Sequence, residues 1–359
     1  MGQADGALRV LIARGWVLAA ILLSGAAARA DDVVFRDIVW PRHDRQTGFL
    51  EWELRADTAR PKPKNQYALF RLELNTYNLV VEKGKKRSKK EMHLTAERGT
   101  YQHGLDSSAA RLAGDVRGKL YGSDPLDFTT DDATVTSTWN PKEDVKTRTI
   151  TTESDVSVVG PTRKLTGKGM TVEEETSEKA GKTTKRKSLL TLDKNVVMEI
   201  WGDAEGGLFP EISGPREKPA PGAEPERTRI TCDGPLDYNR TEGRADFHGN
   251  VVLTQGATNM KCRALTLDFE ETTPEEMAEM KLKHMRAEND VVLTAGDQTF
   301  VGDRFEWDQH TQLGALVGRP VRMTAPDATG TSKRIEFHQK EQLIKYIGNA
   351  EVHIVLKAE

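Results

Sequence analysis

The sequence predicts an elongated all-β protein built from repeated antiparallel strand pairs, and three observations support this prediction. Apolar and polar residues alternate over short runs bounded by glycine, asparagine and aspartate, which is typical of half-buried strands. A polar dipeptide followed by valine recurs at a near-regular spacing, which indicates a repeat array. Of the 359 residues, 37% are apolar and 30% are charged, so a thin, extended core fits the chain better than one compact globule.

The first thirty residues contain the three parts of a secretory signal peptide. Arg9 and Arg14 precede the apolar run Trp16–Ala28, and the small residues Ala28 and Ala30 flank Arg29 at its exit. The apolar run is shorter than the roughly 20 residues of a membrane-spanning helix. We therefore expect residues 1–30 to be cleaved and the mature protein to be periplasmic, with an uncleaved inner-membrane anchor as the alternative.

The repeated motif is a polar turn that leads into a strand, as in FHGNVVLTQG at residues 247–256. Its copies are centred on Asp115, Asp155, Asn195, Asn250, Asp290, Pro320 and Asn349. The successive intervals are 40, 40, 55, 40, 30 and 29 residues. Asparagine and aspartate tolerate positive φ angles, which explains why they recur at turns.

Within each copy, the polar turn is followed by an alternating strand, a glycine-containing bend and a second strand. After Gly249-Asn250, residues Val251 and Leu253 share one face. Helical periodicity is nearly absent. The one candidate helical turn is Thr273–Glu276, which has a capping threonine and a proline in its first turn.

The longest interval contains a stretch without alternation, residues 203–226, which includes five prolines. This composition predicts a linker or a long insert. It divides the mature chain into an N-terminal part, residues 31–202, and a C-terminal part, residues 227–359. Both parts contain the repeat, so the division need not be a change of fold.

The two cysteines, Cys232 and Cys262, are too few and too far apart for a typical metal site. If their strands are neighbours in one sheet, the two side chains could form a disulfide in an oxidising compartment. The alternative is a pair of buried free thiols, and the sequence does not decide between them.

The residues that would mark an enzyme or a metal site are missing. The eight histidines are scattered, and the chain has no G-x-S-x-G elbow, Walker loop or dinucleotide fingerprint. The net charge of −3, with both signs interspersed, does not indicate a nucleic-acid binder. We therefore expect no catalytic residues, no metal and no cofactor.

Two basic runs interrupt the pattern, at residues 83–90 and 182–187. The first contains Lys83, Lys85, Lys86, Arg87, Lys89 and Lys90, and the second contains Lys182, Lys185, Arg186 and Lys187. One interpretation is an anionic partner such as a lipid phosphate. The other, which we favour, is a solvated hairpin loop between two strands.

The order and spacing of several segments resemble the OstA-like periplasmic proteins of lipopolysaccharide transport. LTAERGTYQ at 94–102 and ITTESDVSVVGPTRKLTGKGMTVE at 150–173 resemble LptC. DGPLDYNRTEGRADFHGNVVLTQG at 233–256 and MRAENDVVLTAGDQTFVGDRFEWD at 285–308 resemble the LptA/OstA type. The resemblance implies a β-jellyroll, a V-shaped slide of two antiparallel sheets whose apolar interior holds acyl chains and whose end strands stack on other transport components.

We therefore predict an exported, non-enzymatic protein that shields acyl chains of lipopolysaccharide or a related glycolipid. Its partners are that lipid and other transport components at its edge strands, with a homo-oligomer as a further form and no nucleic acid. The predicted groove residues are Trp52, Leu54, Val251, Leu253, Leu265, Leu267, Phe269, Val291, Leu293, Phe305 and Trp307. Two alternatives are a structural β-repeat protein that assembles through its edges without lipid, and a polysaccharide-active β-helix enzyme.

Overall fold

The computed structural model describes most of the chain after residue 32. The described residues are 33–43, 48–82, 85–104, 107–121, 125–140, 142, 145–179, 182–201, 227–270, 281–341 and 343–354. The predicted signal peptide (1–30), the proline-rich stretch (203–226) and the helical candidate Thr273–Glu276 lie outside these residues. The predicted boundaries of the two parts therefore remain predictions.

The described residues form strands joined by turns, which confirms the all-β prediction. The strands of the N-terminal part are β1 (Phe35–His43), β2 (Leu50–Lys62), β3 (Gln66–Glu82), β4 (Lys85–His103), β5 (Ser107–Leu120), β6 (Leu126–Asn140), β7 (Val145–Val159), β8 (Arg163–Lys179) and β9 (Lys182–Trp201). Those of the C-terminal part are β10 (Arg227–Cys232), β11 (Leu236–Asn239), β12 (Arg244–Gln255), β13 (Thr258–Phe269), β14 (Leu282–Ala295), β15 (Gln298–Asp308), β16 (Leu313–Ala325), β17 (Ala328–His338), β18 (Leu343–Ile347) and β19 (Glu351–Ile354). Over these ranges, no helix has the length and apolar character needed to cross a bilayer.

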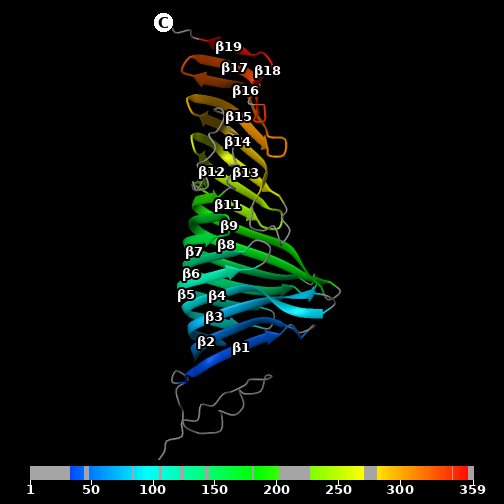
Figure 1. The fold of residues 1–359 in the computed structure, drawn as a ribbon. Helices are drawn as coiled ribbons and strands as arrows, with labels where there is room; N and C mark the ends of the chain where they lie inside the picture. The colour runs from blue at the N-terminus through cyan, green and yellow to red at the C-terminus, as the bar shows by residue number, and fades with distance from the viewer. Residues whose placement is uncertain are drawn as a thin grey trace, which may run out of the picture.

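The strands form one antiparallel sheet that follows the order of the chain (Figure 1). Each strand from β1 to β9 pairs with the next one, and β12 to β17 do the same. The two parts are joined because β9 pairs with both β10 and β11, which together take the place of one strand. The sheet therefore continues without a break from the N-terminal part into the C-terminal part.

The polar dipeptides predicted as turns lie at the middle of long strands. Gly249 and Asn250, for example, fall inside β12 with φ angles of 75° and 48°. The pairing register shifts between His248 and Val251, as it does at a β-bulge. The chain reverses instead at the glycine-containing bends such as Gly256. The prediction of a chain-reversing turn is therefore corrected to a corner, at which positive φ bends a strand that continues.

The corners divide the sheet into two walls that face each other, which gives the predicted jellyroll. Wall A consists of 50–56, 72–82, 85–95, 116–120, 126–130, 156–159, 163–166, 197–201, 227–232, 251–255, 258–262, 291–295, 298–302, 321–325, 328–332 and 351–354. Wall B consists of 58–62, 66–70, 98–103, 107–113, 134–140, 145–152, 170–179, 182–192, 236–239, 244–248, 264–269, 282–288, 304–308, 313–317, 334–338 and 343–347. The two predicted sheets are thus the two halves of one folded sheet.

A single hydrophobic core lies between the walls and runs the length of the array. It extends from Trp52 and Leu54 on β2 to Ile335 and Phe337 on β17. Alternate residues of each strand face inward, because successive side chains of a strand point to opposite faces. The burial pattern of β12, for example, alternates on both sides of its corner.

Candidate functional site

The candidate site is the apolar interior between the two walls. The eleven predicted groove residues all belong to the core, and each is at most 5% exposed. Trp52, Leu54, Val251, Leu253, Val291 and Leu293 come from wall A, whereas Leu265, Leu267, Phe269, Phe305 and Trp307 come from wall B. The structure therefore places them in one shared interior, Trp52 and Leu54 in the N-terminal part and the other nine in the C-terminal part.

Aromatic side chains span the interior and bring the walls into contact. Trp52 of wall A and Tyr101 of wall B have ring centroids 5.4 Å apart, at 68° to each other. Phe300 of wall A and Phe337 of wall B meet 5.2 Å apart, at 87°. Edge-to-face geometry of this kind adds to the hydrophobic contribution of burial. The interior is thus filled by side chains at both ends of the array.

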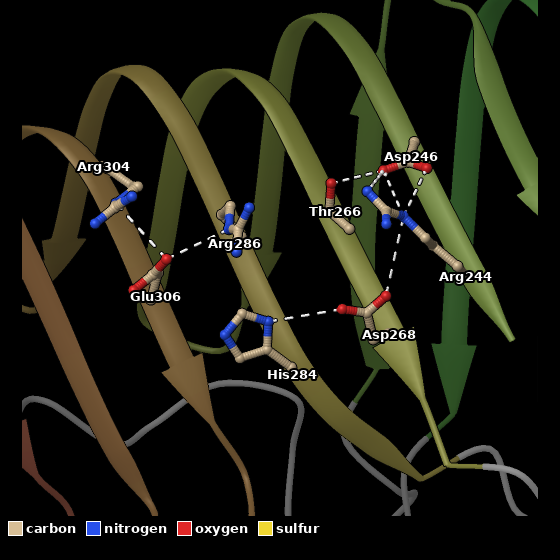
Figure 2. Close-up of polar contacts among 8 residues, drawn as sticks. All are labelled: Arg244, Asp246, Thr266, Asp268, His284, Arg286, Arg304 and Glu306. Atoms are coloured by element: carbon tan, nitrogen blue, oxygen red, sulfur yellow. Dashed lines mark hydrogen bonds and ion pairs between the residues drawn. The ribbon is translucent and has the colours of Figure 1, made fainter. Parts of the chain in front are cut away.

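The outer face of wall B is polar, so its apolar face is the one that turns inward, toward wall A. Figure 2 shows a row of polar, mostly charged side chains, which belong to the neighbouring strands β12, β13, β14 and β15. Its contacts are Arg244–Asp246 (3.0 Å), Thr266–Asp246 (2.6 Å), His284–Asp268 (3.7 Å), Arg286–Glu306 (3.3 Å) and Arg304–Glu306 (3.6 Å). Exposed pairs of this kind contribute about 0–1 kcal/mol each, so their main effect is to keep this face in water.

Two long hairpins from opposite walls close the mouth of the N-terminal part. The hairpin β3–β4 extends wall A, and β8–β9 extends wall B. Figure 1 shows both hairpins reaching past the neighbouring strands on the same side, and β3 contacts β9 there. The corresponding segments of the C-terminal part, such as 251–255 and 258–262, are about half as long.

Charged side chains link the walls beneath this junction. Arg148 of wall B donates to Glu91 of wall A at 2.7 Å and lies 3.6 Å from Glu174. Burial disfavours the charged form of Arg148, but the two carboxylates outweigh it and keep its pKa above the ordinary value. Lys146 and Glu51 form a second link between the walls, at 3.8 Å. A cavity of about 40 Å³ lies among these groups.

A buried arginine links the walls at the junction of the two parts of the chain. Arg163 begins β8 in wall A, and its side chain is 0% exposed. Its guanidinium lies 4.9 Å from the ring centroid of Tyr238 in wall B, a cation–π distance. The interior is therefore apolar along most of the array. Charged side chains connect the two walls through it at two places, in the N-terminal part and at this junction.

An open hollow follows the corner of the C-terminal part on the outside of the core. It has a volume of about 830 Å³ and is lined by polar and charged groups such as Glu288, Asp303, Arg304, Arg319 and Lys333. Charged groups are poor partners for acyl chains, because burying them against hydrocarbon costs free energy. This hollow is therefore separate from the predicted groove.

The two cysteines are free, which agrees with the second of the two alternatives, a pair of buried thiols. Cys232 on β10 and Cys262 on β13 are both buried. Strand β12 lies between their strands, because it pairs with β10 on one side and with β13 on the other. Two strand spacings separate the cysteines by roughly 9–10 Å, which exceeds the span of a disulfide. The disulfide alternative required neighbouring strands, and that condition is not met.

The first basic run lies at the tip of the β3–β4 hairpin, and the second lies at the tip of β8–β9. Both positions agree with the interpretation of the runs as hairpin ends.

The sequence did not predict the roles of the charged residues Glu91, Arg148 and Glu174. A signal for Glu91 was present, since it interrupts the alternation immediately before the buried Met92. Within the described parts of the chain, no group of three or more histidine, cysteine, aspartate or glutamate residues could hold a metal.

Both ends of the sheet carry exposed apolar side chains. Within the described residues, β1 pairs only with β2, and β18 and β19 pair only with β17. The exposed apolar residues at these ends are Val34, Phe35, Val39, Leu343, Ile347, Val352 and Ile354. An unpaired strand edge can hydrogen-bond a strand from another chain. The two edges are thus suited to extension of the sheet.

Comparison with known families assigns each part of the chain separately. Residues 31–180 match the family described as "Lipopolysaccharide-assembly, LptC-related", and residues 234–357 match "LptA/(LptD N-terminal domain) LPS transport protein". No curated protein matches the chain. Among solved structures, LptH from Pseudomonas aeruginosa is similar; its title describes "the LptA homologous periplasmic component of the conserved lipopolysaccharide transport device". The match is 13% identical, covers 36% of this chain and 95% of that one, and has a TM-score of 0.30.

Proposed function

The chain is an OstA-like lipopolysaccharide-transport protein, LptC-related in its N-terminal part and LptA-like in its C-terminal part, and on this basis we propose that it carries lipopolysaccharide or a related glycolipid across the periplasm. One observation carries this proposal. The apolar interior runs through both parts without a break, because β9 pairs with β10 and β11. The single chain thus unites in one sheet two kinds of transport domain.

Acyl chains bind where the inner faces of the walls separate. Binding exchanges apolar contacts between the walls for apolar contacts with hydrocarbon, and each buried methylene contributes about 0.8 kcal/mol. The eleven groove residues supply these contacts. Entry is easier in the C-terminal part, where the mouth lacks the long hairpins of β3–β4 and β8–β9.

The exposed edges extend the path to other transport components. Strand β1 and strands β18 and β19 present free backbone groups and apolar side chains. Addition of a partner strand at either end continues the sheet and its interior. The protein acts in the periplasm as a carrier and not as an enzyme, in keeping with its two families of transport proteins.

Site-specific photocrosslinking in the native envelope tests the proposal. A photoreactive amino acid at Phe269 or Trp307 reports contacts in the interior, and the same residue at Phe70 or Val301 reports contacts on the outer surface. We expect ultraviolet light to produce lipopolysaccharide adducts at the inner positions and not at the outer ones. Native mass spectrometry of the purified protein should then show the bound lipid.

The second candidate is a structural protein that assembles through its edges and binds no lipid. The filled interior and the exposed apolar residues at both ends favour it. It predicts oligomers with a dry interior. Absence of adducts at all inner positions, together with lipid-free oligomers in native mass spectrometry, would therefore replace the carrier function with this one.

A further inference from the structure

The tip of the β3–β4 hairpin is strongly basic. We call residues 77–82 and 85–90, on the two strands of this tip, the basic arm. The whole tip, residues 77–90, contains six lysines and arginines and one acidic residue, Glu82, so its formal charge is 6 − 1 = +5. The chain as a whole has a formal charge of −3. The arm is therefore a segment of high net positive charge in a chain whose total net charge is negative.

The charge of the arm exceeds what a solvated hairpin needs. The β8–β9 hairpin is as long and lies beside it, but residues 173–187 contain five cations and four acids, a formal charge of 5 − 4 = +1. Nearly balanced charge thus suffices to keep a long hairpin in water. The excess on the arm is therefore more than solvation of the hairpin requires.

The cations of the arm whose side chains the structure describes have no partner among the described residues. Lys85, Arg87 and Lys89 are exposed, and Lys90 is half-buried. No ion pair or hydrogen bond joins these four side chains to the described part of the chain. Two exposed arginines elsewhere, Arg117 and Arg263, by contrast pair with aspartates at 2.7 and 2.6 Å.

The three exposed cations form a row on one face of the arm. Lys85, Arg87 and Lys89 occupy alternate positions of β4, so their side chains point to the same side, about 7 Å apart. Their strand partners are Glu82, Val80 and Asn78. Leu79, by contrast, is 6% exposed and packs with the body of the protein. The row therefore faces away from the interior.

We propose that the basic arm docks on a bilayer surface that carries anionic phospholipid. A cluster of four to eight lysines and arginines is the sequence pattern that such surfaces attract. The arm also reaches past the neighbouring strands, so a flat surface can approach it without collision with the body (Figure 1). This docking is a function separate from transport in the interior.

The position of the row near the hairpin tip favours a membrane over the phosphates of the transported lipid. A lipid with its acyl chains between the walls has its headgroup at the mouth, which is where Glu91 and Glu174 lie. Lys85, Arg87 and Lys89 lie nearer the tip of the hairpin than Glu91 does. A surface outside the protein therefore meets the row more readily than cargo does.

Vesicle binding tests the proposal. The purified protein, with the same N-terminus in every variant, is mixed with phosphatidylcholine vesicles that contain or lack phosphatidylglycerol, and sedimentation measures the bound fraction. We expect binding to the anionic vesicles that weakens as salt is added, because salt screens exposed charges. Combined reversal of Lys85, Arg87 and Lys89 to glutamate should reduce it about tenfold or more.

A matched control separates the arm from net charge. Reversal of Lys164, Lys261 and Lys283, which are also exposed, makes the same change in net charge at sites remote from the arm. This variant should keep at least half of the vesicle binding. Equal losses in the two variants, or no preference of the unaltered protein for anionic vesicles, would overturn the proposal and favour an acidic protein partner.

Lipopolysaccharide binding by the same variants distinguishes the membrane from the cargo. We expect the arm variant to bind lipopolysaccharide as the unaltered protein does. Loss of lipopolysaccharide binding with intact vesicle binding would reassign the row to cargo phosphates. Because vesicle binding is measured without lipopolysaccharide, its outcome does not depend on the proposed transport function.

Discussion

Arg148 and Glu91 lie 2.7 Å apart although β5 and β6 separate their strands in the sheet. The pair is therefore a contact between the walls and not between neighbouring strands. Both side chains are mostly buried, with 15% and 7% exposure. Loss of Glu91 removes the hydrogen-bonded carboxylate and leaves Arg148 with the more distant one of Glu174, at 3.6 Å, so its buried charge is less well compensated. We expect Glu91→Ala to lower the free energy of unfolding by about 2–4 kcal/mol, measured by urea denaturation.

A double variant checks that the loss comes from the unpaired charge. Replacing Glu91 with glutamine and Arg148 with methionine removes both charges and keeps similar volumes, so most of the stability should return. Arg55→Ala is the exposed control, since Arg55 is 54% exposed and pairs with Glu53 on the same strand; its effect should stay below about 1 kcal/mol. A Glu91→Ala variant as stable as this control would contradict the interpretation.

Inward and outward positions of one strand should respond differently to a carboxylate. Phe305 and Val301 both lie on β15, but Phe305 is 0% exposed and Val301 is 39% exposed. An aspartate at 305 is buried without a partner, which costs several kcal/mol. We expect Phe305→Asp to lose its strand signal in circular dichroism and Val301→Asp to keep it. If both variants kept the strand signal, or both lost it, the assignment of Phe305 to the core and Val301 to the surface would be wrong.

The sequence predicted correctly which residues of a strand face inward, because side chains alternate between the two faces of a strand and the apolar ones are buried. Val251 and Leu253 were assigned to one inward face, and both are buried. The corners were misassigned because Gly249-Asn250 has the composition of a chain-reversing turn, and composition does not show whether the chain continues. Residues with positive φ occur both in turns that reverse the chain and in corners at which a strand bends and continues.

Contacts that depend on topology were beyond the sequence. The state of Cys232 and Cys262 was left open, because the sequence does not show that strand β12 lies between them. The link between Arg148 and Glu91 likewise requires the walls to fold onto each other. Local patterns report on faces and turns, whereas these contacts follow from which segments meet across the interior.

The left-handed backbone at the corners should make them selective for glycine and asparagine. Asn250 has a φ angle of 48°, and its side-chain amide donates to Asp233 at 2.5 Å. An alanine at this position has to adopt a conformation that costs about 1–2 kcal/mol. We expect Asn250→Ala to lower the free energy of unfolding by that amount, measured by urea denaturation.

Glycine at the same corner provides the comparison. Asn250→Gly loses the bond to Asp233 but adopts positive φ freely. We therefore expect it to lower the free energy of unfolding by no more than half as much as Asn250→Ala does. His248→Ala, at an exposed neighbouring position, should change stability by no more than about 0.5 kcal/mol. Equal effects of alanine and glycine at position 250 would show that backbone conformation does not govern the corner.

The two thiols should be present but unreactive in the folded protein. Burial raises the pKa of Cys232, and it raises the pKa of Cys262 to about 12. A thiol whose pKa is raised stays protonated at neutral pH, and the thiolate is the reactive form. We expect a thiol reagent at pH 8 to label neither residue in the folded protein and to label both after unfolding in urea without a reductant. Intact mass after alkylation in urea should show two added groups. A disulfide would block this labelling until a reductant is added, and rapid labelling of the folded protein would show that the interior between the walls is open to solvent at β10 and β13.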